Sequence, residues 1–158
     1  MDLILLRHGK AEDFNSGGDF SRVLLERGRE QSRSAARLLM ASGQLPEIVL
    51  TSPLVRARQT ADEFCETAGI PAALIQEWLA CGMVPAKAMA ELAAFQHFKR
   101  VAIVGHEPDF SLLVERLLGV KGGIVDFKKG AIACIQIAPT SRYGKLRYLV
   151  PPRLADGN

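Results

Sequence analysis

One short stretch near the amino terminus constrains this chain more than any other. Residues 3–6 are all aliphatic, and Arg7, His8 and Gly9 follow them directly. A continuous apolar run bounded by a glycine predicts a strand buried on both faces, as in the middle of a parallel sheet. Arg7 and His8 would then lie at the carboxyl end of that strand, where open α/β sheets bind their ligands. The alternative is a strand that ends in ordinary surface residues.

A second apolar run repeats this pattern later in the chain. Residues 101–104 are Val-Ala-Ile-Val, and Gly105 and His106 follow them. Two of the three histidines therefore stand at the ends of the two most apolar strands. Because the carboxyl ends of parallel strands meet at one edge of a sheet, we expect His8 and His106 to lie close together. A histidine after a strand, such as His106, is also often a hydrogen-bonded structural residue. The third histidine, His97, falls on a predicted helix without polar neighbours, and we interpret it as structural.

The periodicity of the remaining chain predicts alternating strands and helices. The expected helices cover residues 26–42, 53–68, 85–98 and 107–118, and the expected strands cover 48–50, 73–75, 131–137 and 146–150. We expect Ser52 to cap the second helix, with Pro53 at its first position. The alternation predicts an α/β fold, a three-layer α/β/α sandwich with a mostly parallel central sheet. The last two strands add a possible antiparallel edge, joined by a hairpin at residues 139–144.

The length of 158 residues fits one domain, which we assign to residues 1–150, followed by a loose tail at residues 151–158. The formal charge of +3 comes without a basic block, so nothing supports nucleic-acid binding. The first apolar run is too short for a signal peptide or a membrane span. Cys65, Cys81 and Cys134 show no disulfide or metal-binding spacing. We interpret them as packing residues with free thiols in a reducing cytoplasm.

The predicted elements bring several polar groups to one edge of the sheet. Arg7 and His8 follow the first strand, His106 follows a later one, and Arg56 lies in the first turn of the second helix. The starts of two helices, near Pro53 and Pro108, would point to the same edge. This pocket is expected to contain no carboxylate among its core members. It favours an anion, and a phosphoryl group is the natural candidate. Arg56 alone is also compatible with an ordinary solvated helix residue.

Three segments in this order resemble the motifs of the histidine phosphatase superfamily, which includes the cofactor-dependent phosphoglycerate mutases. The similarity extends from Leu3 to about Leu118, and its motifs are Leu6-Arg7-His8-Gly9, Ser52-Pro53-Leu54-Val55-Arg56-Ala57-Arg58-Gln59-Thr60 and Gly105-His106. The resemblance implies a phosphoglycerate mutase-like fold. It also implies a phosphatase that forms a phosphohistidine intermediate on His8.

The short chain and the segment at residues 77–82 resemble one branch of this family, the small bacterial SixA-type phosphohistidine phosphatases. In that branch an arginine before the first helix also reaches the phosphate, and Arg22 stands in its place. The family pattern after this arginine is Pro-Leu-Thr, whereas this chain has Val23-Leu24-Leu25. Leu25 cannot cap a helix as threonine does, so the start of the first helix is less well determined than the role of Arg22.

The resemblance assigns roles to these positions. His8 and His106 are the catalytic residues, and the phosphate is bound by Arg7, Arg22, Arg56 and Gly9. No metal and no cofactor is implied, because the arginines neutralise the charge. Glu77 is the only candidate proton donor in the right region, and its alternative is an ordinary surface role. Glu12 and Asp109 are poorer candidates for the same role.

The absence of a clear acid favours phosphohistidine on a protein as the substrate, because a leaving nitrogen is easily protonated. The partner implied by the branch is a histidine-containing phosphotransfer domain in signal transduction. A phosphatase for small phosphate esters, or a mutase, on the same scaffold is an alternative, as is a non-catalytic phosphate-binding module. A metal hydrolase that uses His8 and His106 would need more carboxylates than the pocket offers.

Overall fold

Six strands form one mixed sheet in the order β3-β2-β4-β1-β5-β6. The computed structural model describes residues 1–138 and 143–155. The strands are β1 (Asp2–Arg7), β2 (Ile48–Thr51), β3 (Leu74–Ile75), β4 (Arg100–Gly105), β5 (Ile132–Gln136) and β6 (Lys145–Val150). Strands β1 to β4 are parallel, and β5 and β6 are antiparallel to their neighbours, which confirms the predicted sheet. The predicted hairpin turn falls mainly on residues 139–142, which lie outside the described residues.

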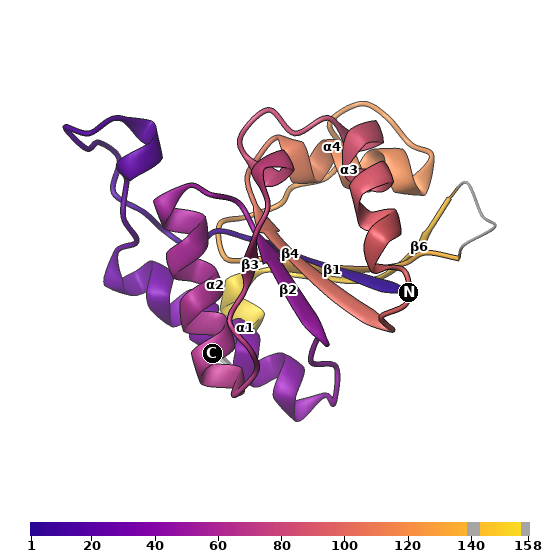
Figure 1. The fold of residues 1–158 in the computed structure, drawn as a ribbon, viewed down its shortest axis with the longest axis horizontal. Helices are drawn as coiled ribbons and strands as arrows, with labels where there is room; N and C mark the ends of the chain where they lie inside the picture. Colours follow the sequence, from indigo (N-terminus) through magenta and orange to yellow (C-terminus); the bar gives the residue numbers. More distant parts are fainter. Residues whose placement is uncertain (139–142, 156–158) are drawn as a thin grey trace.

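Two layers of helices cover this sheet, as Figure 1 shows. The first layer holds α1 (Glu26–Ala41) and α2 (Val55–Ala68), and the second holds α3 (Pro85–Leu92) and α4 (Asp109–Leu118). Three short 3₁₀ helices join them in the described chain, namely η1 (Asp19–Ser21), η2 (Glu77–Leu79) and η3 (Ala93–Phe95). The protein is therefore the α/β/α sandwich that the sequence predicts.

Strand β1 lies in the middle of the sheet and is apolar on both faces. Leu3 and Leu5 pack into the core under α3 and α4, whereas Ile4 and Leu6 pack into the core under α1 and α2. Side chains alternate across a strand, so only a strand covered on both sides needs apolar residues at every position. The burial of all four residues explains why this run has no polar member.

The second helix starts later than the sequence predicts. It begins at Val55, and its N-cap residue is Leu54 without a side-chain cap. Ser52 still belongs to the end of the sheet, where its backbone N–H donates to the Val104 carbonyl. The predicted helix at residues 85–98 is also too long, since α3 ends at Leu92 and a 3₁₀ turn follows.

The carboxyl-terminal segment that we expected to be loose contains a short helix, α5 (Pro152–Ala155). This helix packs against α1, and Pro152 is buried. Residues 156–158 lie outside the described part of the chain.

The start of α1 packs directly on the backbone that follows β1. A Cβ atom on Gly9 would lie 2.4 Å from the carbonyl oxygen of Gly28, and a Cβ on Gly28 would lie 2.1 Å from the carbonyl oxygen of Lys10. Both separations are shorter than any real contact, so only glycine fits at the two positions. This close approach seats the loop after β1 between the sheet and α1.

We expect Gly28→Ala to destabilise the protein by about 1–3 kcal/mol, because the new methyl group overlaps the Lys10 carbonyl. Helix propensity alone predicts the opposite, a gain of about 1 kcal/mol. Urea denaturation measures the difference. Arg27→Ala, at the exposed neighbouring position of the same helix, serves as the control and should stay within about 0.5 kcal/mol of the wild type. A more stable Gly28→Ala protein would contradict the close approach.

Candidate active site

The register between β1 and β4 brings the two strand-end histidines together. Arg7 pairs with Gly105, so His8 and His106 are the next residues on neighbouring parallel strands. Their ring centroids are 5.2 Å apart, and their exposed fractions are 6% and 2%. Arg56, from the first turn of α2, is also buried. The structure thus gathers a buried group of imidazoles and guanidinium groups at the carboxyl edge of the sheet.

One hydrogen bond determines the tautomer of His8. Its Nδ1 atom lies 2.9 Å from the carbonyl oxygen of Gly9. A carbonyl oxygen only accepts hydrogen bonds, so Nδ1 carries the proton and donates it. In the neutral ring Nε2 then has a free lone pair.

The surroundings of His8 keep its ring neutral. The pKa of His8 is lowered to about 3. Burial is the largest cause, and the neighbouring His106, Arg56 and Arg7 act in the same direction, whereas the Gly9 hydrogen bond opposes them. Nε2 of His8 is therefore an available nucleophile at neutral pH.

His106 is oriented by the serine of the second motif. Its Nε2 atom lies 2.7 Å from Ser52 Oγ, which is itself fully buried. Ser52 Oγ also accepts a hydrogen bond from the Leu54 N–H, so its own hydroxyl proton is available to His106 Nε2. The proton of neutral His106 then lies on Nδ1. Burial and the charge of Arg56 lower the pKa of His106 to about 4.

The rest of the second motif connects α2 to the loop after β1. Thr60 Oγ1 accepts a hydrogen bond from the Gly9 N–H at 3.2 Å and donates to the Arg56 carbonyl at 2.7 Å. Gln59 Oε1 accepts a hydrogen bond from the Leu24 N–H. The Gly9 N–H, which we expected to bind the phosphate, is thus paired with Thr60, and the Gly9 carbonyl orients His8.

Three buried donors around His8 have no hydrogen-bond partner among the described residues. They are Arg7 Nε, Arg56 Nε and His106 Nδ1. The guanidinium of Arg7 is anchored through Nη1, which donates to the Phe127 carbonyl at 2.6 Å. Unpaired buried donors are costly and rare in native proteins, so a group of three indicates a site for an acceptor with several oxygens.

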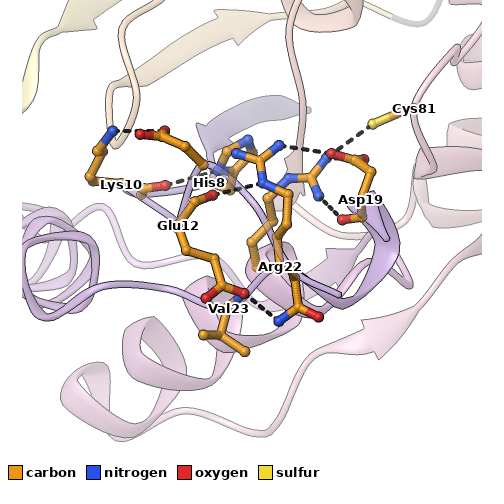
Figure 2. Close-up of polar contacts among 11 residues, drawn as sticks. His8, Lys10, Glu12, Asp19, Arg22, Val23 and Cys81 are labelled. Atoms are coloured by element: carbon orange, nitrogen blue, oxygen red, sulfur yellow. Dashed lines mark hydrogen bonds and ion pairs between the residues drawn. The ribbon is translucent and has the colours of Figure 1, made fainter. Parts of the chain in front are cut away.

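Arg22 reaches this site through a carboxylate that the sequence analysis missed. Asp19 Oδ1 accepts a hydrogen bond from Arg22 Nη1 at 2.7 Å, and Asp19 Oδ2 accepts one from Arg56 Nη2 at 3.0 Å. Figure 2 shows Asp19 and Arg22 joined in this way beside His8. The expectation that the pocket holds no carboxylate is therefore wrong. The sequence does contain a signal for this ion pair. An acidic residue stands three positions before Arg22, a spacing that fits the single turn of η1.

Cys81 is the second residue that the sequence analysis misjudged. It is exposed rather than packed in the core, and its Sγ atom accepts a hydrogen bond from Arg56 Nη2 at 3.4 Å. Cys65 and Cys134 are buried free thiols, as expected.

The candidate proton donors do not gather at His8. Glu77 is exposed at the start of η2, and within the described chain no hydrogen bond or ion pair joins its side chain to another residue. The Glu12 carboxylate accepts hydrogen bonds from Asn15 and from the Val23 N–H. Asp109 accepts one from the Gly82 N–H. The last two carboxylates stabilise loops.

The part of the chain that the structure describes contains neither a metal-binding cluster nor a membrane-spanning helix. No three His, Cys, Asp or Glu side chains are grouped in a way that could hold a metal ion. No described helix is long and apolar enough to cross a membrane.

Comparison with known proteins identifies this arrangement. The model of the histidine phosphatase superfamily (branch 1) matches residues 3–79. The phosphohistidine phosphatase SixA of Escherichia coli K12 is 30% identical over 120 residues, which cover 74% of each chain. The chain belongs to the histidine phosphatase superfamily. An uncharacterised protein of Picosynechococcus is similar at 31% identity, over 84% of this chain and 82% of the relative.

Solved structures of other proteins have the same fold as this chain. The protein histidine phosphatase SixA complexed with tungstate superposes with a TM-score of 0.90 at 26% identity, over 98% of this chain and 99% of the other. An Escherichia coli protein described as a putative alpha-ribazole-5'-P phosphatase has a TM-score of 0.76 at 23% identity, over 96% and 97% of the two chains. The second similarity shows the shared fold alone.

We expect the His8 and His106 rings to stay neutral from about pH 8 to about pH 5, because both pKa values lie well below the ordinary value of about 6.5. NMR spectra of the ring nitrogens measure this directly. The unfolded chain takes up these protons near pH 6.5, whereas the folded protein does not. The free energy of unfolding should therefore fall as the pH drops below about 6.5. A titration midpoint between about 6 and 7 for either folded ring would contradict the expectation.

Proposed function

We propose that this protein is a phosphatase that works through a phosphohistidine on His8 and removes phosphate from phosphohistidine on another protein. The observation that carries the proposal is the group of unpaired buried donors around a neutral His8. A phosphoryl group offers several strong acceptor oxygens in a small volume. Arg7, Arg56 and His106 would each donate to one of these oxygens.

The proposed reaction has two in-line steps. In the first, the Nε2 lone pair of His8 attacks phosphorus, an N–P bond forms, and the bond to the leaving group breaks. In the second, water attacks the phosphorylated His8, the N–P bond breaks, and inorganic phosphate leaves. Arg7, Arg56 and His106 stabilise the charge on the phosphoryl oxygens in both steps, and Arg22 adds positive charge from the loop. These donors neutralise the phosphoryl charge, so the proposal includes no metal.

The arrangement of carboxylates supports a substrate with a nitrogen leaving group. No contact places Glu77 near His8, and Asp19 is held ionised by Arg22, which lowers its pKa. A phosphohistidine needs no strong enzyme acid, because its leaving nitrogen is basic. The similarity to proteins described as phosphohistidine phosphatases agrees with this substrate. A histidine-containing phosphotransfer domain in the cytoplasm, within a signalling pathway, is the partner that we propose.

Hydrolysis of small phosphate esters is the second candidate function. The fold that this chain shares with the putative alpha-ribazole-5'-P phosphatase favours it. In that function Glu77 would have to approach the leaving oxygen during the reaction as the proton donor.

We expect the protein to hold an acid-labile phosphoryl group after brief exposure to phosphorylated substrate, and His8→Ala to hold none. Turnover by His8→Ala should fall by more than about 10³-fold, because the nucleophile is missing. Rapid quenching and intact-mass measurement at alkaline pH detect the intermediate. The matched control is His97→Ala, which removes an exposed histidine of the same chain. The wild type is also assayed with and without a chelator, and activity lost on its addition would contradict metal-independent chemistry.

We expect kcat/KM for a phosphohistidine-bearing phosphotransfer domain to exceed kcat/KM for small phosphomonoesters by at least about 100-fold, since only the nitrogen leaving group departs without an acid. Phosphate release from both substrates is measured at the same pH. Glu77→Gln should leave both rates within about twofold of the wild type. Faster turnover of the esters, or their selective loss in Glu77→Gln, would favour the small-ester function. If the wild type forms no intermediate with either substrate, the protein is a non-catalytic phosphate-binding module.

A further inference from the structure

We infer that Asp19 is a positioning residue that holds Arg22 and Arg56 in place for the phosphoryl group. Its two carboxylate oxygens bind different arginines, with Oδ1 on Arg22 Nη1 and Oδ2 on Arg56 Nη2. The inference rests on the proposed function, since the phosphoryl group is the ligand that the two arginines would share. The motifs that identify the family do not include Asp19.

Asp19 holds Arg56 at two points. The Asp19 main-chain carbonyl accepts a hydrogen bond from Arg56 Nη1 at 2.7 Å, in addition to the carboxylate contact with Nη2. A planar guanidinium bound at both terminal nitrogens cannot rotate freely. Its Nε donor is buried and has no partner among the described residues. Asp19 therefore fixes the plane of Arg56 and leaves Nε for the phosphoryl group.

Asp19 also holds Arg22 over the site. Arg22 Nε donates to the Glu12 carbonyl at 2.7 Å, and its Nη1 donates to Asp19 Oδ1 at 2.7 Å. Figure 2 shows these contacts joining the two ends of the loop at residues 12–22. Without the Asp19 carboxylate between them, the two guanidinium groups would repel each other more strongly, and the half-buried Arg22 would gain by turning to solvent.

The exposure of the two partners indicates on which side of Arg56 the carboxylate lies. The Asp19 side chain is 59% exposed, whereas the Arg56 side chain is 5% exposed. The carboxylate thus binds the outer, solvent-facing end of a buried arginine. Because the Asp19 backbone takes part, the loop itself is fitted to Arg56, and the contact is more than a movable anion in the phosphate position.

The test compares Asp19→Ala and Asp19→Asn with Asp13→Asn. Asp13 lies in the same loop and pairs with Lys10 at 3.1 Å, so the control removes an equal charge nearby. Each protein is assayed for kcat and KM with an aryl phosphate and with a phosphohistidine peptide. Tungstate affinity is measured by calorimetry as a phosphate-site probe that needs no turnover, and thermal unfolding reports stability.

We expect Asp19→Ala to lose about 10–100-fold in kcat/KM on both substrates by the same factor, mainly through kcat, with tungstate bound at least about 10-fold more weakly. Both variants keep the main-chain carbonyl, but only Asp19→Asn keeps one side-chain acceptor oxygen, so it should lie between Asp19→Ala and the wild type. Asp13→Asn should match the wild type within about twofold. If Asp19 positions the arginines, loss of stability does not explain the loss of activity. The unfolding temperatures of the variants should therefore not follow the order of their activities.

Three results would overturn the inference. Tighter tungstate binding by Asp19→Ala would make Asp19 a competitor of the phosphate. Loss of activity on the phosphohistidine peptide alone would make it a contact of the leaving group. Unchanged activity and tungstate affinity would leave it a loop-stabilising residue. If the wild type turns over neither substrate, the proposed function fails, and the tungstate titration still decides whether Asp19 positions the arginines.

Discussion

The parallel pairing of β1 with β4 is the interaction on which the rest of this protein depends. Its register sets Arg7 beside Gly105, and the next residue on each strand is a histidine. A shift by one residue would turn every side chain of β1 to the opposite face and separate the two rings. The shift is opposed because the buried run Leu3 to Leu6 is flanked by the polar Asp2 and Arg7, one of which would have to enter a fully buried position. Hydrophobic burial therefore sets the position of the polar site.

Burial also gives that site its chemistry. Desolvation is the largest cause of the low pKa values of His8 and His106, and it keeps both rings neutral beside several positive charges. One internal hydrogen bond offsets part of the desolvation cost of each buried polar group. His8 bonds to the Gly9 carbonyl, His106 to Ser52, and Arg7 to the Phe127 carbonyl. The donors that remain unpaired are those for which an oxyanion would be the partner. A neutral nucleophile and cationic donors coexist for this reason.

The motif residues divide into those that face the site and those that hold it together. Arg7, His8, Arg56 and His106 form the site, whereas Ser52, Gln59 and Thr60 bind the loops and rings that carry it. The glycines after β1 and in α1 allow the close backbone contact behind His8. Asp19 adds a connection that no motif indicates, between the loop arginine and the helix arginine. A sheet edge, a helix start and a surface loop thus converge on one candidate anion site.

The sequence by itself determined the sheet, its helical layers and the convergence of His8, His106 and Arg56, because apolar periodicity and strand ends are local properties of the chain. The tertiary structure decided the contacts between distant segments. Ser52 binds His106 across 54 positions, and Asp19 binds Arg56 across 37 positions. Glu77 is exposed on the surface, although its position in the sequence made it a candidate for the site. Such pairings depend on how loops fold over a finished core, and no pattern in neighbouring residues encodes them.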